Sequence, residues 1–148
     1  MEMTSNLFGK KKYSDMAKIG ILVDYTDSYA ARPVNEDIAC VSTGRTLEEM
    51  KRNMDEALHF HVEGMFQDGD SVPDELKGEW EYDWQLSARA LLHHTEGLVS
   101  KAAISRATGI NQQQLTHYST GYRTPRPAMR KRIVDGIHAI AKQLFSIS

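Results

Sequence analysis

The spacing of apolar residues along the chain predicts a strand-rich first part followed by a helical second part. Branched apolar residues dominate residues 17–24 (AKIGILVD), which predicts a first strand. Shorter runs at 29–33 and 38–42, set apart by turn-forming residues, predict a second and a third strand. Residues 79–85 (EWEYDWQ) alternate aromatic with acidic or amide side chains, and this period of two predicts a half-buried or edge strand.

Between the third and fourth predicted strands the apolar residues step by three or four, which predicts a helix from Leu47 to about Gln67. Thr46 and Glu49 form the Thr-x-x-Glu pattern of a capping box at its start. We expect one stripe of this helix to pack on the sheet. Its members are Leu47, Met50, Met54, Leu58, His61 and Met65.

The second part begins with a short predicted helix over 87–95, followed by two short helices joined by a tight turn within 101–125. Gly109 lies in that turn, where it can supply the positive φ that other residues resist. Ser100 and Asn111 are placed to cap the two helices. The inward residues that we expect are Ala103, Ile104 and Ala107 in the first, and Ile110, Leu115 and Tyr118 around the second.

A last helix is predicted from Pro127 onward, with Gly136 in its interior as either a break or a close approach of another helix. Its expected inward residues are Met129, Ile133, Ile137, Ile140 and Leu144. The C-terminal end is more apolar than one small module needs. We therefore predict a dimer contact there, formed by Leu144, Phe145 and Ile147.

The second helix of the tight pair carries polar side chains on the face opposite its apolar residues, namely Gln112, Gln113, Thr116 and His117. Side-chain amides can donate and accept together, which matches the edge of adenine in the major groove of DNA. A packed face behind and amides in front is typical of the recognition helix of a helix-turn-helix domain. Solvation of a helix by consecutive glutamines is the alternative interpretation.

The net charge of −2 hides a strong asymmetry. Residues 1–78 carry nine basic and fifteen acidic side chains, whereas residues 99–148 carry eight basic and one acidic. A basic C-terminal part fits a domain that contacts phosphates. The predicted phosphate contacts are Ser100, Lys101, Arg123, Arg126 and Arg130.

The chain has 148 residues, 41% of them hydrophobic, and a single cysteine, Cys40. One cysteine excludes an internal disulfide framework and fits the reducing cytoplasm. No apolar run has the length of about 20 residues that a membrane span needs. Residues 1–16 contain a lysine trio but no apolar segment of signal-peptide length, and we expect a flexible tail.

Two segments resemble HicB-type antitoxins. Residues 40–49 (CVSTGRTLEE) are similar to that family's Cys-x-x-x-Gly-x-Thr-x-Glu-Glu signature, and residues 56–73 (EALHFHVEGMFQDGDSVP) to the helix and exit that follow it. Ile38-Ala39 stands where the family usually has Pro-Gly, and residues 29–33 match the family pattern poorly. Residues 86–144, with Gly121-x-x-x-Pro125, look like the phage-repressor-type, Xre-like helix-turn-helix attached in some members.

The resemblance implies an α+β protein. A βββαβ partial RNase H-like domain that binds a toxin would span 17–85, and an all-α helix-turn-helix domain 86–148. It implies neutralisation of a small basic HicA-type mRNA-cleaving toxin and repression of the shared operon through operator DNA. Such a protein would lie in the cytoplasm of a bacterium or archaeon, at the nucleoid when bound to DNA.

The acidic residues that we expect to meet a basic toxin lie beside the predicted sheet: Asp24, Asp27, Glu36 and Asp37. Charge complementarity acts strongly on the rate of such an association. An orphan transcription regulator, whose first domain binds another ligand or only dimerises, is the main alternative. In either case repressor-like modules read paired half-sites, so we expect a homodimer or a higher even oligomer.

Enzymatic chemistry is not indicated by the sequence. A two-metal nuclease, the second alternative, needs converging carboxylates, and most of the available ones are predicted in turns or on an exposed helix face. His59 and His61 are two residues apart on a helix and point in different directions, so they cannot share a metal. We expect no catalytic residues, no metal and no cofactor.

Overall fold

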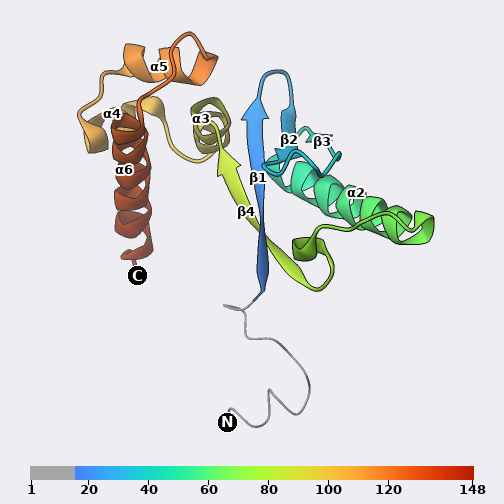
Figure 1. Ribbon diagram of the computed structural model, residues 1–148. Helices are drawn as coiled ribbons and strands as arrows, with labels where there is room; N and C mark the ends of the chain where they lie inside the picture. The colour runs from blue at the N-terminus through green and yellow to red at the C-terminus, as the bar shows by residue number, and fades with distance from the viewer. Residues whose placement is uncertain (1–15) are drawn as a thin grey trace. The chain divides into compact units, whose positions relative to one another are not determined.

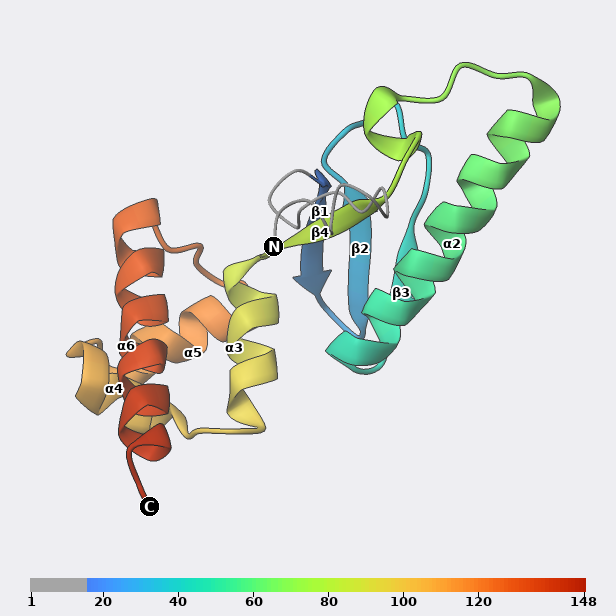
Figure 2. The ribbon, with the colours of Figure 1, turned by 90° about the horizontal axis from the view of Figure 1, so that it is seen from below.

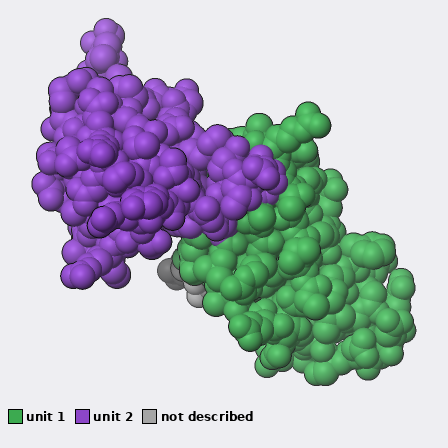
Figure 3. Space-filling model, turned by 90° about the horizontal axis from the view of Figure 1, so that it is seen from above, with its two compact units in different colours: residues 1–22, 30–85 green, residues 23–29, 86–148 purple. Residues whose placement is uncertain are grey.

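The computed structural model describes residues 16–148 (Figure 1). The predicted tail, 1–16, lies outside these residues except for Met16. The chain is an α+β protein with a four-stranded mixed sheet and a helix in its first part and several helices in its second. The chain divides into two compact units (Figure 3). Unit 1 comprises the described residues up to Leu22 together with Ala30–Gln85, and unit 2 comprises Val23–Tyr29 and Leu86–Ser148.

The sheet has the strand order β3-β2-β1-β4. Its strands are β1 (Ala17–Tyr25), β2 (Tyr29–Pro33), β3 (Ser42–Gly44) and β4 (Trp80–Leu86). In Figure 1 the arrowheads of β1 and β4 point the same way, while β2 returns beside β1 after a short hairpin. The first two predicted strands and the edge position of the fourth are therefore confirmed.

The third strand was predicted too early, at 38–42. Ile38 is buried, but it lies in a turn, where its N–H donates to the Asn35 carbonyl (3.1 Å). The Asn35 side chain also accepts from the N–H of Asp37 (3.0 Å). This Asx turn occupies the backbone that a strand would need, so pairing starts only at Ser42.

The long helix α2 (Leu47–Asp68) packs on one face of the sheet (Figure 2). Thr46 caps it by accepting from the Glu49 N–H (3.1 Å), as predicted, while the Glu49 carboxylate accepts from Arg45 rather than from Thr46. The C-cap is Gly69 in the left-handed region, φ 73°. The predicted stripe is correct through Leu58, but Val62 is buried next, and His61 and Met65 are only half-buried.

A short 3-10 helix, η2 (Asp74–Leu76), leads from α2 into β4. The remaining helices are α3 (Ala88–Glu96), α4 (Lys101–Thr108), α5 (Gln112–Thr120) and α6 (Pro127–Phe145). They enclose a core of Leu92, Ile104, Ile110, Leu115, Tyr118 and Ile133, with Leu91, Val99, Met129, Ile137 and Ile140 packed against it.

Helix α4 buries Ile104 as predicted, but its second inward residue is Thr108, whereas Ala107 is exposed and Ala103 half-buried. The Thr108 hydroxyl donates to the Ile104 carbonyl (2.7 Å), and its methyl faces Gly136 of α6. Helix α6 runs without a break through Gly136, so the close approach is the correct alternative at that residue.

Candidate nucleic-acid interface

Helix α5 presents a packed face and a polar face. The Asn111 side chain caps it by accepting from the Gln114 N–H (2.7 Å). Leu115 and Tyr118 are buried in the core of unit 2. The opposite face exposes Gln112, Gln113 and Thr116, with His117 half-buried beside them. The preceding turn contains Gly109 with φ 75°, as the sequence predicts.

The polar side chains of α5 differ in how much hydrogen-bonding capacity they have left. The Gln114 amide donates to the Tyr118 hydroxyl (2.7 Å), and the Thr116 hydroxyl donates to the Gln112 carbonyl (3.0 Å). The side chains of Gln112 and Gln113 make no hydrogen bond to any residue that the structure describes. Two free amides and the Thr116 methyl are therefore what α5 offers to a ligand.

One aromatic side chain next to this face is not among the site residues that the sequence predicts. Tyr122, just after the C-cap Gly121, is 73% exposed. Its ring centroid lies 4.9 Å from that of His117, and the guanidinium carbon of Arg123 lies 5.9 Å from the Tyr122 ring. In the sequence, the available signal for this contact is a tyrosine followed by an arginine directly after Gly121. The three side chains form a cluster that extends the polar face of α5.

The predicted phosphate contacts fall into two groups. Lys101 is paired with Glu96 (2.8 Å), and Arg130 donates to the Leu86 carbonyl (2.6 Å). The Ser100 hydroxyl oxygen caps α4, where it accepts a hydrogen bond from the Ala103 N–H (3.1 Å). Arg123 and Arg126 are exposed and form no ion pair among residues 16–148. These two arginines are the predicted cations with the most freedom to meet an anion.

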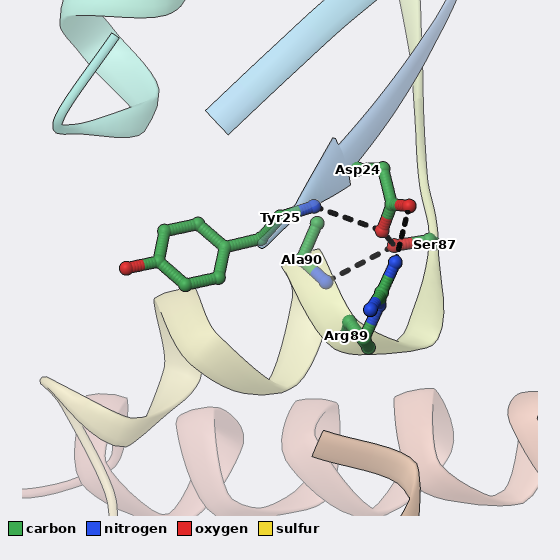
Figure 4. A network of polar contacts seen from close by, with 5 residues as sticks. All are labelled: Asp24, Tyr25, Ser87, Arg89 and Ala90. Carbon is green, nitrogen blue, oxygen red and sulfur yellow. Dashed lines mark hydrogen bonds and ion pairs between the residues drawn. The ribbon is translucent and has the colours of Figure 1, made fainter. Parts of the chain in front are cut away.

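A polar network ties the β1–β2 hairpin to helix α3 within unit 2 (Figure 4). Asp24 accepts from the Arg89 guanidinium (2.8 Å) and from the Ser87 hydroxyl (2.5 Å), and Ser87 also caps α3 by accepting from Ala90 (3.1 Å). Tyr25 stacks on His93 with ring centroids 3.6 Å apart.

The Arg89 side chain also packs against Gly121, since a Cβ on Gly121 would meet the Cδ of Arg89 at 2.6 Å. Arg89 therefore joins the hairpin to the turn that ends α5.

Asp24 stays ionised in this network. Partial burial acts to raise the pKa of the Asp24 carboxyl, but the hydrogen bonds from Arg89, Ser87 and the Tyr25 N–H outweigh burial and lower the pKa below its ordinary value. Of the predicted toxin contacts, Asp24 is thus already engaged. Asp27 in the hairpin turn, and Glu36 and Asp37 in the turn after β2, are exposed.

The predicted dimer contacts lie at the exposed end of α6 and just beyond it. Leu144 is 58% exposed, Phe145 92% and Ile147 74%. Leu144 was also expected to face inward, and this second expectation is wrong. The last fully buried residue of α6 is Gly136 and the last one packed against the core is Ile140, while every residue from 141 onward is exposed.

Cys40, half-buried beside Met54, has its pKa raised by burial, which disfavours a reactive thiolate. Within residues 16–148 no group of three or more His, Cys, Asp or Glu side chains could hold a metal ion. None of the helices in that range is both long and apolar enough to cross a membrane. No protein-family model matches the sequence, and no curated protein is detectably similar to it.

Proposed function

We propose that the chain is a HicB-type antitoxin that represses its own operon through operator DNA and neutralises a HicA-type toxin. Helix α5 carries the proposal. It has a packed face, a capped N-terminus and two unpartnered amides on its exposed face, and this combination suits direct readout in the major groove. In this proposal α4, the Gly109 turn and α5 form the helix-turn-helix, with α5 as the recognition helix.

The charges of unit 2 support the DNA-binding part. Arg123 and Arg126 flank the C-terminal side of α5 and are free to pair with phosphates, while Gln112 and Gln113 face base edges. Lys101 and Arg130 would first have to leave Glu96 and the Leu86 carbonyl. We therefore rank Arg123 and Arg126 as the main phosphate contacts.

The order βββαβ supports the antitoxin part, because it is the order that the resemblance to HicB-type antitoxins implies for a partial RNase H-like domain. The acidic charge of residues 1–78 suits a basic toxin that must itself grip RNA phosphates. One observation favours the orphan regulator as a second candidate. Asp24, a predicted toxin contact, already serves as an internal partner of Arg89 and Ser87.

Two measurements test the proposal. The first is binding of the full chain to the DNA upstream of its own reading frame, against a scrambled duplex of equal length, as a function of salt. Arg123→Ala should reduce the salt slope of binding by about one unit. The second is co-purification with the product of the neighbouring small reading frame, combined with relief of its toxicity. Upstream DNA bound no better than the scrambled duplex contradicts the repressor; repression without co-purification favours the orphan regulator.

A further inference from the structure

The solvent-facing side of α2 carries large apolar side chains that the chain itself does not cover. Phe60 is 80% exposed and Phe66 57% exposed, and they are spaced three residues on either side of Glu63. Val41, in the segment before β3, is 74% exposed. We define the acidic aromatic face as Val41, Glu56, Phe60, Glu63, Gly64 and Phe66. Clustered exposed aromatics are typical of surfaces that bind a partner.

The stretch of sequence that carries these aromatics is strongly acidic. Residues 53–76 contain seven acidic side chains and no lysine or arginine. Asp55, Asp74 and Glu75 have partners in His59, Lys77 and Asn35. Glu56, Glu63, Asp68 and Asp70 form no ion pair with any residue that the structure describes. Phe60 and Phe66 thus lie in an acidic segment in which four carboxylates have no ion-pair partner among the described residues.

Each phenylalanine borders an open groove of unit 1. Phe60 lines a groove of about 440 Å³ between α2 and the segment before β3, together with Val41, Asp68 and Asp70. Phe66 lies beside a groove of about 800 Å³ between α2 and the start of β4, which includes Trp80 and Glu63. Apolar side chains of a partner can enter either groove while its cations meet the acidic rim.

Gly64 points to the same face independently. It lies inside α2, where glycine costs about 1 kcal/mol relative to alanine. A Cβ at Gly64 would meet nothing within 4 Å, so packing within the described chain does not require glycine there. Gly64 is four residues after Phe60 and lines the same groove. Its missing side chain leaves room for another backbone to approach Phe60.

We propose that the acidic aromatic face docks a basic protein segment whose apolar side chains alternate with lysine or arginine. A second copy of the chain is a poor occupant, because two such faces would bring like charges together. Nucleic acid is excluded by the same sign of charge. The inference deepens the antitoxin proposal and rests on it for the partner's identity as the toxin. It moves the main toxin contact from Asp27, Glu36 and Asp37 to α2.

The test uses the full chain and a labelled helical peptide with leucine at every third or fourth position and lysine elsewhere. Fluorescence anisotropy measures binding. Two control peptides replace all lysines by glutamate or all leucines by serine. We expect the leucine–lysine peptide to bind, with an affinity that falls as salt is added, and neither control peptide to bind. The inference is overturned if the wild-type chain does not bind this peptide, or if it binds the glutamate peptide equally well.

Two variants locate the site. Phe60→Gln with Phe66→Gln should weaken peptide binding at least about tenfold, because aromatic anchors dominate such interfaces. Gly64→Gln should weaken it similarly by filling the approach beside Phe60. Both place glutamine, a helix-favouring residue, on the outer side of α2, so circular dichroism should show no loss of helix.

Matched controls change charge or apolar surface elsewhere. Asp27→Lys with Asp37→Lys alters the other acidic site, and Leu98→Ser removes an exposed apolar side chain from the loop before α4. Both should leave peptide affinity within about twofold of wild type. Wild-type affinity in the α2 variants, or loss in the Asp27 and Asp37 variant alone, contradicts docking on α2. Operator binding and toxin co-purification are measured separately. A toxin that binds the chain on another surface would therefore contradict this inference and leave the proposed function standing.

Discussion

Among the four consecutive amides in 111–114, Gln112 and Gln113 are the two whose side chains make no hydrogen bond to a residue of the described part of the chain, since Asn111 caps α5 and Gln114 bonds Tyr118. An amide that already serves the fold cannot also pair with a base without loss of stability. The amides that are free to read DNA are therefore fewer than the run of polar residues suggests. Thr116, whose hydroxyl is directed to the Gln112 carbonyl, offers chiefly its methyl group.

Gln113→Ala is expected to lower operator affinity by about 1–3 kcal/mol, the usual value of one good bidentate base contact, and to leave non-specific binding unchanged. Thr116→Val is the matched control. It keeps the methyl surface and removes a hydroxyl that serves the backbone, so operator affinity should stay close to wild type. Titration of both variants against operator and scrambled duplexes measures this. Equal loss on both duplexes for Gln113→Ala would mean that α5 does not read the sequence.

Asp24 makes the stability of unit 2 depend on acid. Its pKa in the folded chain is lowered from the ordinary value of 3.8, so the stabilisation is fully present above that value and is lost as pH falls through the folded pKa. Asp24→Asn keeps the shape but not the charge. The difference in Tm between wild type and variant should therefore be largest near neutral pH and shrink below about pH 4. A difference that does not change with pH would show that the charge of Asp24 contributes nothing.

At the scale of elements, most of the fold was predictable because local signals agreed with packing. The caps at Thr46, Ser100 and Asn111, and the stripe of α2 as far as Leu58, follow from helix chemistry alone. The predictions are wrong where a turn or a neighbouring helix determines which residues pair or are buried. The Asn35 turn displaces β3, and the approach of α6 selects Thr108 instead of Ala107 for burial.

The candidate site was predictable in outline but not in its partners. Sequence identifies the polar face of α5 because Leu115 and Tyr118 stand at helical spacing behind it. It cannot show that Glu96 holds Lys101, that Arg130 bonds the Leu86 carbonyl, or that Arg89 holds Asp24. Arg89 and Asp24 are 65 residues apart, and only the fold brings them together.

Two glycines inside helices illustrate opposite constraints. A Cβ on Gly136 would lie 2.3 Å from the Thr108 methyl, whereas one on Gly64 would meet nothing within 4 Å. Gly136→Ala should lower the free energy of unfolding by about 1–3 kcal/mol, since α4 and α6 must separate. Gly64→Ala should raise it by up to about 1 kcal/mol. Chemical denaturation of both variants measures the two effects.

The pair Gly136 and Thr108 also provides a control for that prediction. Thr108→Ser removes the methyl group that Gly136 accommodates and keeps the hydroxyl that bonds the Ile104 carbonyl. In the Thr108→Ser background, Gly136→Ala should lower the free energy of unfolding much less than it does in the wild-type chain. The effects of the two substitutions should therefore not be additive in a double-mutant cycle. Strictly additive costs would place the strain elsewhere.

At the scale of the whole molecule, the exposed apolar surface is unevenly distributed. Part of it lies on α2 within an acidic region, and part lies at the end of α6 within the basic segment 99–148. The charges of the two regions have opposite sign, so one kind of partner cannot suit both. We infer that the α2 surface suits a basic protein. The α6 end suits contact with a second copy, because Lys142 is the only lysine, arginine, aspartate or glutamate in 136–148 and little like charge would be brought together there.

The end of α6 is expected to hold a homodimer together. Leu144, Phe145 and Ile147 gain burial only if another surface covers them, and a repressor needs two copies to read paired half-sites. Sedimentation of the full chain should give a dimer, and a chain ending at Gln143 should give a monomer with weaker operator binding. Leu98→Ser, which removes a leucine that is more exposed than Leu144 from the loop before α4, is the control and should stay dimeric. A truncated chain that still sediments as a dimer would place the contact on another surface, because all three residues on which the prediction depends are absent from it.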